Sequence, residues 1–95
     1  MKTWYLYLIR TKYKALYTGI SLDVARRLQE HQQGKGAKAL KGKEPLKLVF
    51  SYKIGDFDLA LRVERKIKSL SKIQKEAIIS SKTMITTLIK SCQKK

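Results

Sequence analysis

The chain has 95 residues, and 43% of them are hydrophobic, which suits one modest core and predicts a single domain over residues 1–95. Lys and Arg total 22 while Asp and Glu total 7, so the net charge is +15 at neutral pH. The single cysteine excludes an internal disulfide framework, and one His with one Cys excludes a metal site of four such ligands. Because no apolar run approaches the about 18 residues of a transmembrane helix, we expect a soluble, cytoplasmic protein with no membrane partner.

The positive charge is spread along the chain and is not gathered in a tail. Residues 1–33, 34–49, 50–70 and 71–95 carry net charges of +4, +4, +2 and +5. A folded body this basic most often binds nucleic acid. Two alternatives stay open, namely a lysine-rich protein without a specific polyanion partner and weak attachment of the C-terminal helices to a membrane surface.

The first half of the chain predicts two strands and a helix. Residues 3–9 are rich in aromatic and β-branched side chains and predict a strand. Residues 15–19 predict a second short strand, which ends at its last residue, Gly19. Ser21 stands where the N-cap of a helix is expected, and the helical apolar pattern continues as far as His31. Residues 34–45 then form a basic loop punctuated by glycines.

The second half predicts a third strand followed by helices. Residues 46–52 favour a strand, and Asp56 is placed to cap a helix whose apolar residues recur at spacings of four, four and three. Ser71 can cap the next segment, in which we expect Ile73 to face inward, and a last short helix is expected around residues 84–89.

The order β-β-α-β-α-α predicts an α+β fold, with a small antiparallel sheet flanked by helices. We expect the core to span about residues 3–82 and a basic helix and tail to occupy about residues 83–95.

A few residues have the chemistry of a catalytic site. Arg27 and His31 are one helical turn apart, while Val24 and Leu28 lie on a different face, so we expect Arg27 and His31 to point away from the core. Each candidate also has a structural alternative: tyrosines in strands commonly pack in the interior, and Glu64 can simply pair with the lysine four residues later.

The chain resembles the GIY-YIG nuclease superfamily over almost its whole length, and the small stand-alone bacterial members in particular. Tyr5-Leu6-Tyr7 stands where the first tripeptide belongs, and Tyr17-Thr18-Gly19 where the second does. The run from Thr18 to His31 is similar to the family's helix-entry motif, and residues 59–68 are similar to its acidic helix.

The resemblance implies a three-stranded antiparallel sheet that carries Tyr7 and Tyr17 on neighbouring strands. Tyr17, helped by Tyr7, would relay a proton from the attacking water. Arg27 would hold the scissile phosphate, with His31 beside it, and Glu64 would be the only protein ligand of one Mg²⁺ or Mn²⁺ ion.

Elementary chemistry gives independent reasons for these roles. The guanidinium of Arg27 offers fixed donors to phosphate oxygens that gain negative charge during cleavage. A single carboxylate suits Mg²⁺, which keeps most of its waters. A tyrosine acts as a base near neutral pH only if positive charge lowers its pKa from about 10, and we expect Arg27 to supply that charge.

The sequence departs from the family pattern in two places. Some relatives carry a lysine directly after the second tripeptide, where this chain has Ile20, and many have an Asn after the acidic helix, whereas no Asn occurs here. The predicted activity is metal-dependent hydrolysis of DNA with low sequence specificity, in repair or processing, and these departures predict that it is weak. The alternative is a module that keeps the fold and binds nucleic acid without cutting it.

The substrate expected is single-stranded, branched or damaged DNA. We expect no sequence-specific readout, because phosphate contacts carry no base information. We expect backbone contacts from the following residues: Gly19, Arg26, Lys35, Lys38, Lys41, Lys72, Lys75, Lys82 and Lys90.

Overall fold

The structure is a computed structural model that describes residues 2–93. The elements in chain order are β1 (Trp4–Arg10), β2 (Leu16–Ser21), α1 (Val24–Gln32), a short 3₁₀ helix (Lys38–Leu40), β3 (Lys47–Gly55), α2 (Phe57–Lys68), α3 (Lys72–Ser80) and α4 (Lys82–Gln93). Within this described range, none of the helices has the length and apolar character needed to cross a membrane.

The three strands form one antiparallel sheet in the order β2-β1-β3, so β1 is the central strand. Tyr7 in β1 lies opposite Gly19 in β2 and opposite Ser51 in β3. The predicted α+β fold with a three-stranded antiparallel sheet is confirmed. The described residues follow the order β-β-α-β-α-α-α, which has one α-helix more than the expected order; α4 is the last helix that was expected, and it is longer than residues 84–89.

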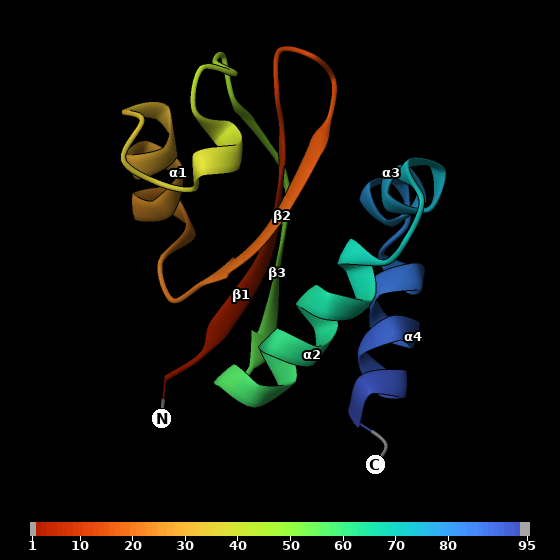
Figure 1. Ribbon diagram of the computed structural model, residues 1–95. Coiled ribbons are helices and arrows are strands. Elements are labelled where there is room, and N and C mark those ends of the chain that lie inside the picture. Colours follow the sequence, from red (N-terminus) through yellow and green to blue (C-terminus); the bar gives the residue numbers. More distant parts are fainter. Residues whose placement is uncertain (1, 94–95) are drawn as a thin grey trace.

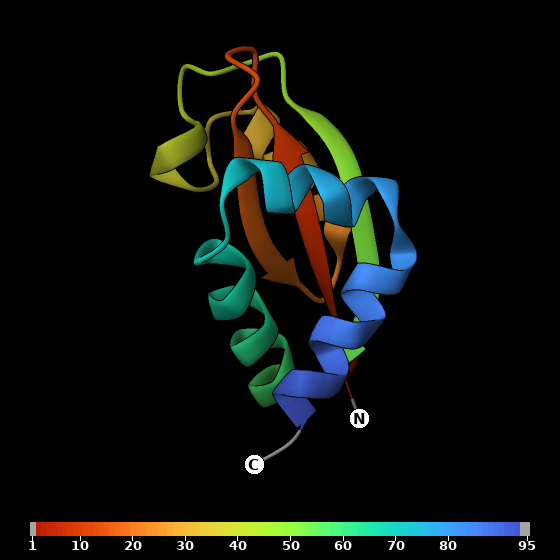
Figure 2. The ribbon, with the colours of Figure 1, turned by 90° about the vertical axis from the view of Figure 1, so that its right-hand side faces the viewer.

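Helices cover both faces of the sheet. Figure 1 shows α1 and the 3₁₀ segment on one side and α2, α3 and α4 on the other, and Figure 2 shows the last three lying across the same face. Successive residues of a strand point to opposite faces. In β1, Leu6 and Leu8 therefore pack against the α2–α4 layer, whereas Tyr7 and Ile9 pack on the α1 side.

The C-terminal helix belongs to the core. Ile85 of α4 is fully buried together with Val63 and Ile67 of α2 and Ile78 of α3. Of the segment expected as a basic helix and tail, residues up to Gln93 belong to α4, and residues 94 and 95 lie outside the described part of the chain. The expected inward position of Ile73 is wrong, because its side chain is 82% exposed.

Capping residues define where the helices begin. Asp56 accepts a hydrogen bond from the Leu59 amide, and Ser71 forms a capping box with Gln74, as predicted. The expected cap at Ser21 is wrong, because Asp23 accepts from the Arg26 amide and caps α1.

Two strands are longer than predicted. The second strand does not end at its glycine, since β2 pairs with β1 as far as Ser21. The third strand runs from Lys47 to Gly55 and so extends beyond residue 52. Both strands are extended by pairing with the central strand β1, and the strand preference of single residues does not include such pairing.

Candidate active site

Three aromatic rings from three elements lie together on the α1 side of the sheet. Tyr7 and Tyr17 come from the adjacent strands β1 and β2, and His31 comes from the last turn of α1. The ring centroids are 6.3 Å apart for Tyr7 and Tyr17, 6.0 Å for Tyr7 and His31, and 5.6 Å for Tyr17 and His31. The structure therefore brings together three of the residues that the sequence singled out.

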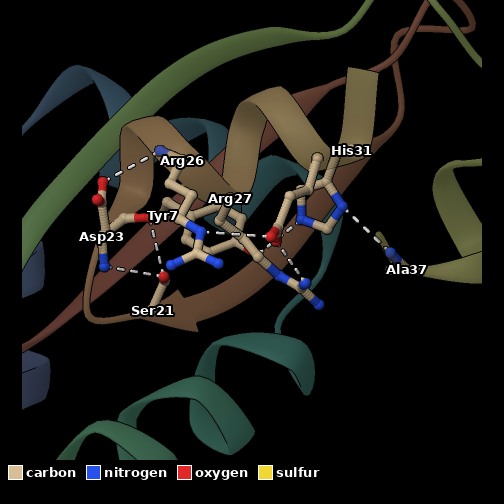
Figure 3. Close-up of polar contacts among 8 residues, drawn as sticks. Tyr7, Ser21, Asp23, Arg26, Arg27, His31 and Ala37 are labelled. Carbon is tan, nitrogen blue, oxygen red and sulfur yellow. Dashed lines mark hydrogen bonds and ion pairs between the residues drawn. The ribbon is translucent and has the colours of Figure 1, made fainter. Parts of the chain in front are cut away.

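His31 is held by hydrogen bonds at both ring nitrogens. The backbone N–H of Ala37 donates to Nδ1 over 3.1 Å, and Nε2 lies 2.9 Å from the hydroxyl of Tyr7 (Figure 3). A backbone N–H can only donate, so Nδ1 is an acceptor, and the proton of the neutral ring is on Nε2. His31 therefore donates to Tyr7, and the phenolic proton of Tyr7 points elsewhere.

His31 is buried, with 1% of its surface exposed, so the expectation that it points away from the core is wrong. Burial lowers the pKa of His31, and the nearby charge of Arg27 lowers it further. The side chain is therefore neutral near pH 7. It contacts the phenol of Tyr7, which places it behind the tyrosines and away from solvent.

Glycines make room for this arrangement at two positions. A Cβ at Gly36 would overlap Nδ1 of His31, and a Cβ at Gly19 would overlap the hydroxyl of Tyr7. Gly19 is itself buried, so the space that its missing side chain leaves is filled by the Tyr7 ring.

Arg27 lies on α1 beside the aromatic cluster. Its Nη1 donates to Glu30 over 3.0 Å, and Nε of Arg26 lies 3.5 Å from the other oxygen of the same carboxylate. The bond to Glu30 raises the pKa of Arg27, so the guanidinium stays charged. Sequence reasoning missed Glu30, although its spacing of three and four residues from the two arginines is the ordinary signal for such pairs.

The pKa of the Tyr7 phenol is raised, whereas the charge of Arg27 had been expected to lower it. Burial and the neighbouring Tyr17 raise the pKa of Tyr7 to about 12, while Arg27 lowers it and Glu64 raises it slightly. For Tyr7 the prediction of a lowered pKa is wrong, because desolvation outweighs the charge of Arg27. Tyr7 therefore keeps its proton at neutral pH.

Glu64 approaches from α2, on the opposite side of the sheet from α1 (Figure 1). Its side chain is 14% exposed and lies 3.4 Å from the ammonium of Lys68, and its charge is near enough to raise the pKa of Tyr7. Glu64 follows the buried Val63 and lies at the rim of the packed face, which accounts for its partial burial.

The donor set at Glu64 decides what kind of metal site it can form. Among residues 2–93 no group of three or more His, Cys, Asp or Glu side chains could enclose an ion. One carboxylate paired only with a lysine fits a hydrated Mg²⁺ or Mn²⁺ that keeps most of its waters, and it does not fit a site made entirely of protein ligands.

Three lysines lie in the connection that also holds Ala37. Lys35, Lys38 and Lys41, called the loop lysines below, are exposed. The α1–β3 connection therefore carries free positive charge on its outside and holds His31 with a backbone N–H on its inside.

The three-stranded antiparallel sheet, with Tyr7 and Tyr17 on neighbouring strands, agrees with what the GIY-YIG resemblance implies. A family model described as the GIY-YIG catalytic domain matches residues 3–77. The chain therefore belongs to the GIY-YIG family, a nuclease superfamily, as its resemblance predicted.

Similar proteins place the chain among small members of that family. It is 55% identical over 93 residues to the UPF0213 protein YhbQ of Salmonella typhimurium and to a UPF0213 protein of Citrobacter koseri, with 98% of this chain and 93% of each relative covered. The solution NMR structure of a UPF0213 protein from Bacillus halodurans is 37% identical, has a TM-score of 0.54, and is matched over 82% of this chain and 83% of that one.

Proposed function

We propose that this protein hydrolyses phosphodiester bonds of DNA with the help of one divalent cation and with low sequence specificity. The observation that carries the proposal is that four side chains converge on the phenol of Tyr7. His31 forms a hydrogen bond with the phenol, Tyr17 lies beside it, and the charges of Arg27 and Glu64 are near enough to shift its pKa. A guanidinium, a carboxylate and two phenols on four elements are the groups that phosphodiester hydrolysis needs.

Each residue has a distinct task in this proposal. Arg27 contacts the non-bridging oxygens of the scissile phosphate. Tyr17, which is only partly buried, takes a proton from the attacking water and releases its own to solvent. Tyr7 keeps its proton and donates a hydrogen bond toward the reacting atoms, while His31 is a positioning residue that orients the Tyr7 hydroxyl.

Glu64 would hold Mg²⁺ or Mn²⁺. When bound, the ion supplies Lewis-acid stabilisation of the leaving oxygen. In the structure, the carboxylate of Glu64 is 14% exposed and lies 3.4 Å from the ammonium of Lys68, which is 53% exposed, and a divalent cation would replace this lysine as the partner of the carboxylate.

The substrate we propose is single-stranded, branched or damaged DNA, met in the cytoplasm during repair or processing. The loop lysines and Arg26 are exposed and can contact the phosphate backbone. Contacts of this kind do not distinguish one base sequence from another.

The alternative is a module that binds nucleic acid without cutting it. One observation favours it: Arg27 is occupied by Glu30 in the structure, and the chain has Ile20 instead of a second cation beside the tyrosines. In that case binding would persist and cleavage would be absent in the unmodified protein.

Cleavage of labelled single- and double-stranded DNA with Mg²⁺ tests the proposal. We expect the unmodified protein to cut and the Glu64→Gln and Arg27→Ala variants to lose at least about 100-fold in rate, because each removes a group that stabilises the transition state. Chelation of the metal should abolish cleavage.

The matched control for Glu64→Gln is Asp58→Asn. Asp58 lies on the same helix and makes an i,i+4 pair with Arg62 as Glu64 does with Lys68, so Asp58→Asn removes one carboxylate charge and one such pair at a more exposed position, 76% against 14%. Equal cleavage by all the variants would indicate a contaminating nuclease and would remove the proposal.

A further inference from the structure

A hollow of about 400 Å³ opens beside Arg27, where β1 begins and β2 ends. Its volume is within the ~300–1,000 Å³ of ordinary small-ligand pockets. The residues lining it that matter here are Trp4, Ile20, Leu22, Arg26, Arg27 and Glu30. The proposed function uses Arg27 for the scissile phosphate and Arg26 for contact with the phosphate backbone, so the apolar residues of the hollow have no assigned task.

Trp4 forms the apolar wall of the hollow together with Ile20 and Leu22, and Phe57 lies against Trp4 outside this lining. The ring of Trp4, which is half-buried, lies 4.9 Å from the ring of Phe57 at an interplanar angle of 58°. Phe57, the first residue of α2, is 49% exposed, and Leu22 beside the hollow is 39% exposed. These large apolar side chains stay in contact with water because nothing in the described chain covers them.

The opposite wall carries the guanidinium groups of Arg26 and Arg27 beside the carboxylates of Asp23 and Glu30, and Glu30 pairs with both arginines. The side chain of Arg26 is 77% exposed and that of Arg27 is 38% exposed, and Figure 3 shows both guanidinium groups on the same side of α1. An aromatic surface beside two guanidinium groups matches the two parts of a nucleotide, because a base stacks on a ring and a phosphate accepts from arginine.

We propose that the Trp4–Phe57 pair is a stacking platform for one unpaired nucleobase, whose adjoining phosphate is held by Arg26. This rests on the proposed function only in that nucleic acid is the ligand. Bases inside a duplex have both faces covered by their neighbours, so the platform takes a base only from a single strand, a flap or a flipped position. Residues of this hollow would thus select unpaired substrates next to the phosphate that Arg27 holds.

Fluorescence titration tests the platform directly, since Trp4 is the only tryptophan in the chain. Protein carrying Glu64→Gln is titrated with a short oligothymidylate, with the same backbone made abasic, and with a blunt duplex. We expect the oligothymidylate to quench Trp4 and the abasic strand to bind roughly 5- to 100-fold more weakly, the range that loss of a stacked base produces. Oligouridylate in a parallel titration distinguishes RNA from DNA as the source of the base.

Variants make the assignment specific. Trp4→Leu should weaken binding of the oligothymidylate by the same factor and leave duplex binding unchanged, whereas Trp4→Phe should keep most of the affinity. Tyr13→Leu is the matched control, because Tyr13 is a 66% exposed aromatic in the turn at the other end of β1. Its affinity should change by less than about two-fold.

Equal affinity for abasic and base-bearing strands would overturn the platform, and so would an unquenched Trp4. Both results use the intact aromatic pair, so a misfolded variant cannot produce them. Because binding is measured in a variant designed not to cleave, loss of the platform and loss of the hydrolase are separate results. Quenching without any cleavage by the unmodified protein would retain the platform and remove the enzyme.

Discussion

Breaking the hydrogen bond between Tyr7 and His31 should destabilise the fold in a strongly non-additive way. Both side chains are almost completely buried, at 2% and 1% exposure, and each is the hydrogen-bond partner of the other. Tyr7→Phe leaves Nε2–H of His31 without an acceptor, and His31→Phe leaves the hydroxyl of Tyr7 without its donor. A buried polar group left unsatisfied costs about 1–3 kcal/mol.

The double variant removes both polar groups, so it should cost less than the sum of the two single variants. His31→Phe also orphans the N–H of Ala37, but this loss occurs in the single and the double variant alike and cancels from the cycle. We therefore expect a coupling energy of about 1 kcal/mol or more between the two positions.

Denaturant unfolding of the four proteins measures this coupling. Each kcal/mol should lower the melting temperature by roughly 4–8 °C in a domain of this size, so the single variants remain measurable by thermal unfolding as well. Additivity within about 0.5 kcal/mol would refute the arrangement, because it would show that the two side chains do not depend on each other.

Three further predictions concern acid, the core and the loop lysines. Burial holds the pKa of His31 below 6.5 in the folded protein. The stabilising contribution of the neutral ring is therefore present above about pH 6.5 and is lost as the pH falls through the folded-state pKa. Lowering the pH from about 7.5 to about 5 should lower the melting temperature of the unmodified protein, and it should lower that of His31→Gln less. Ile85→Ala should cost about 2–5 kcal/mol by denaturant unfolding and Ile73→Ala less than about 0.5, and similar losses would mean that α4 is not part of the core. Replacing all three loop lysines with Gln should reduce the slope of log affinity for a single strand against log salt by roughly 2, and an unchanged slope would exclude them from phosphate contact.

Local signals predicted much of the fold. Asp56 and Ser71 act as caps because their side chains bond amides only three residues away, and such contacts are visible in sequence spacing. The position of Ile73 was not predictable in the same way. Ile73 has the apolar character of a core residue, but the packing of α3 against α4 decides which face of α3 is buried.

In the candidate site, too, some features were predictable from the sequence and others depend on packing. Motif spacing brought Tyr7 and Tyr17 into consideration, and strand pairing does place them on one face. The burial of His31 depends on the α1–β3 connection folding back so that Ala37 meets its ring, a contact across a glycine loop that periodicity does not encode. The raised pKa of Tyr7 follows mainly from the burial of its own phenol, which explains why a prediction based on the charge of Arg27 had the wrong sign.

Paramagnetic broadening by Mn²⁺ tests whether a carboxylate on α2 and two phenols on β1 and β2 share one site. In NMR titrations with substoichiometric Mn²⁺, we expect the ring signals of Tyr7, Tyr17 and His31 to broaden before those of Tyr13, and Glu64→Gln to remove the difference. Broadening that is equal at Tyr13 and Tyr17, or that persists unchanged in Glu64→Gln, would show that no such shared site exists.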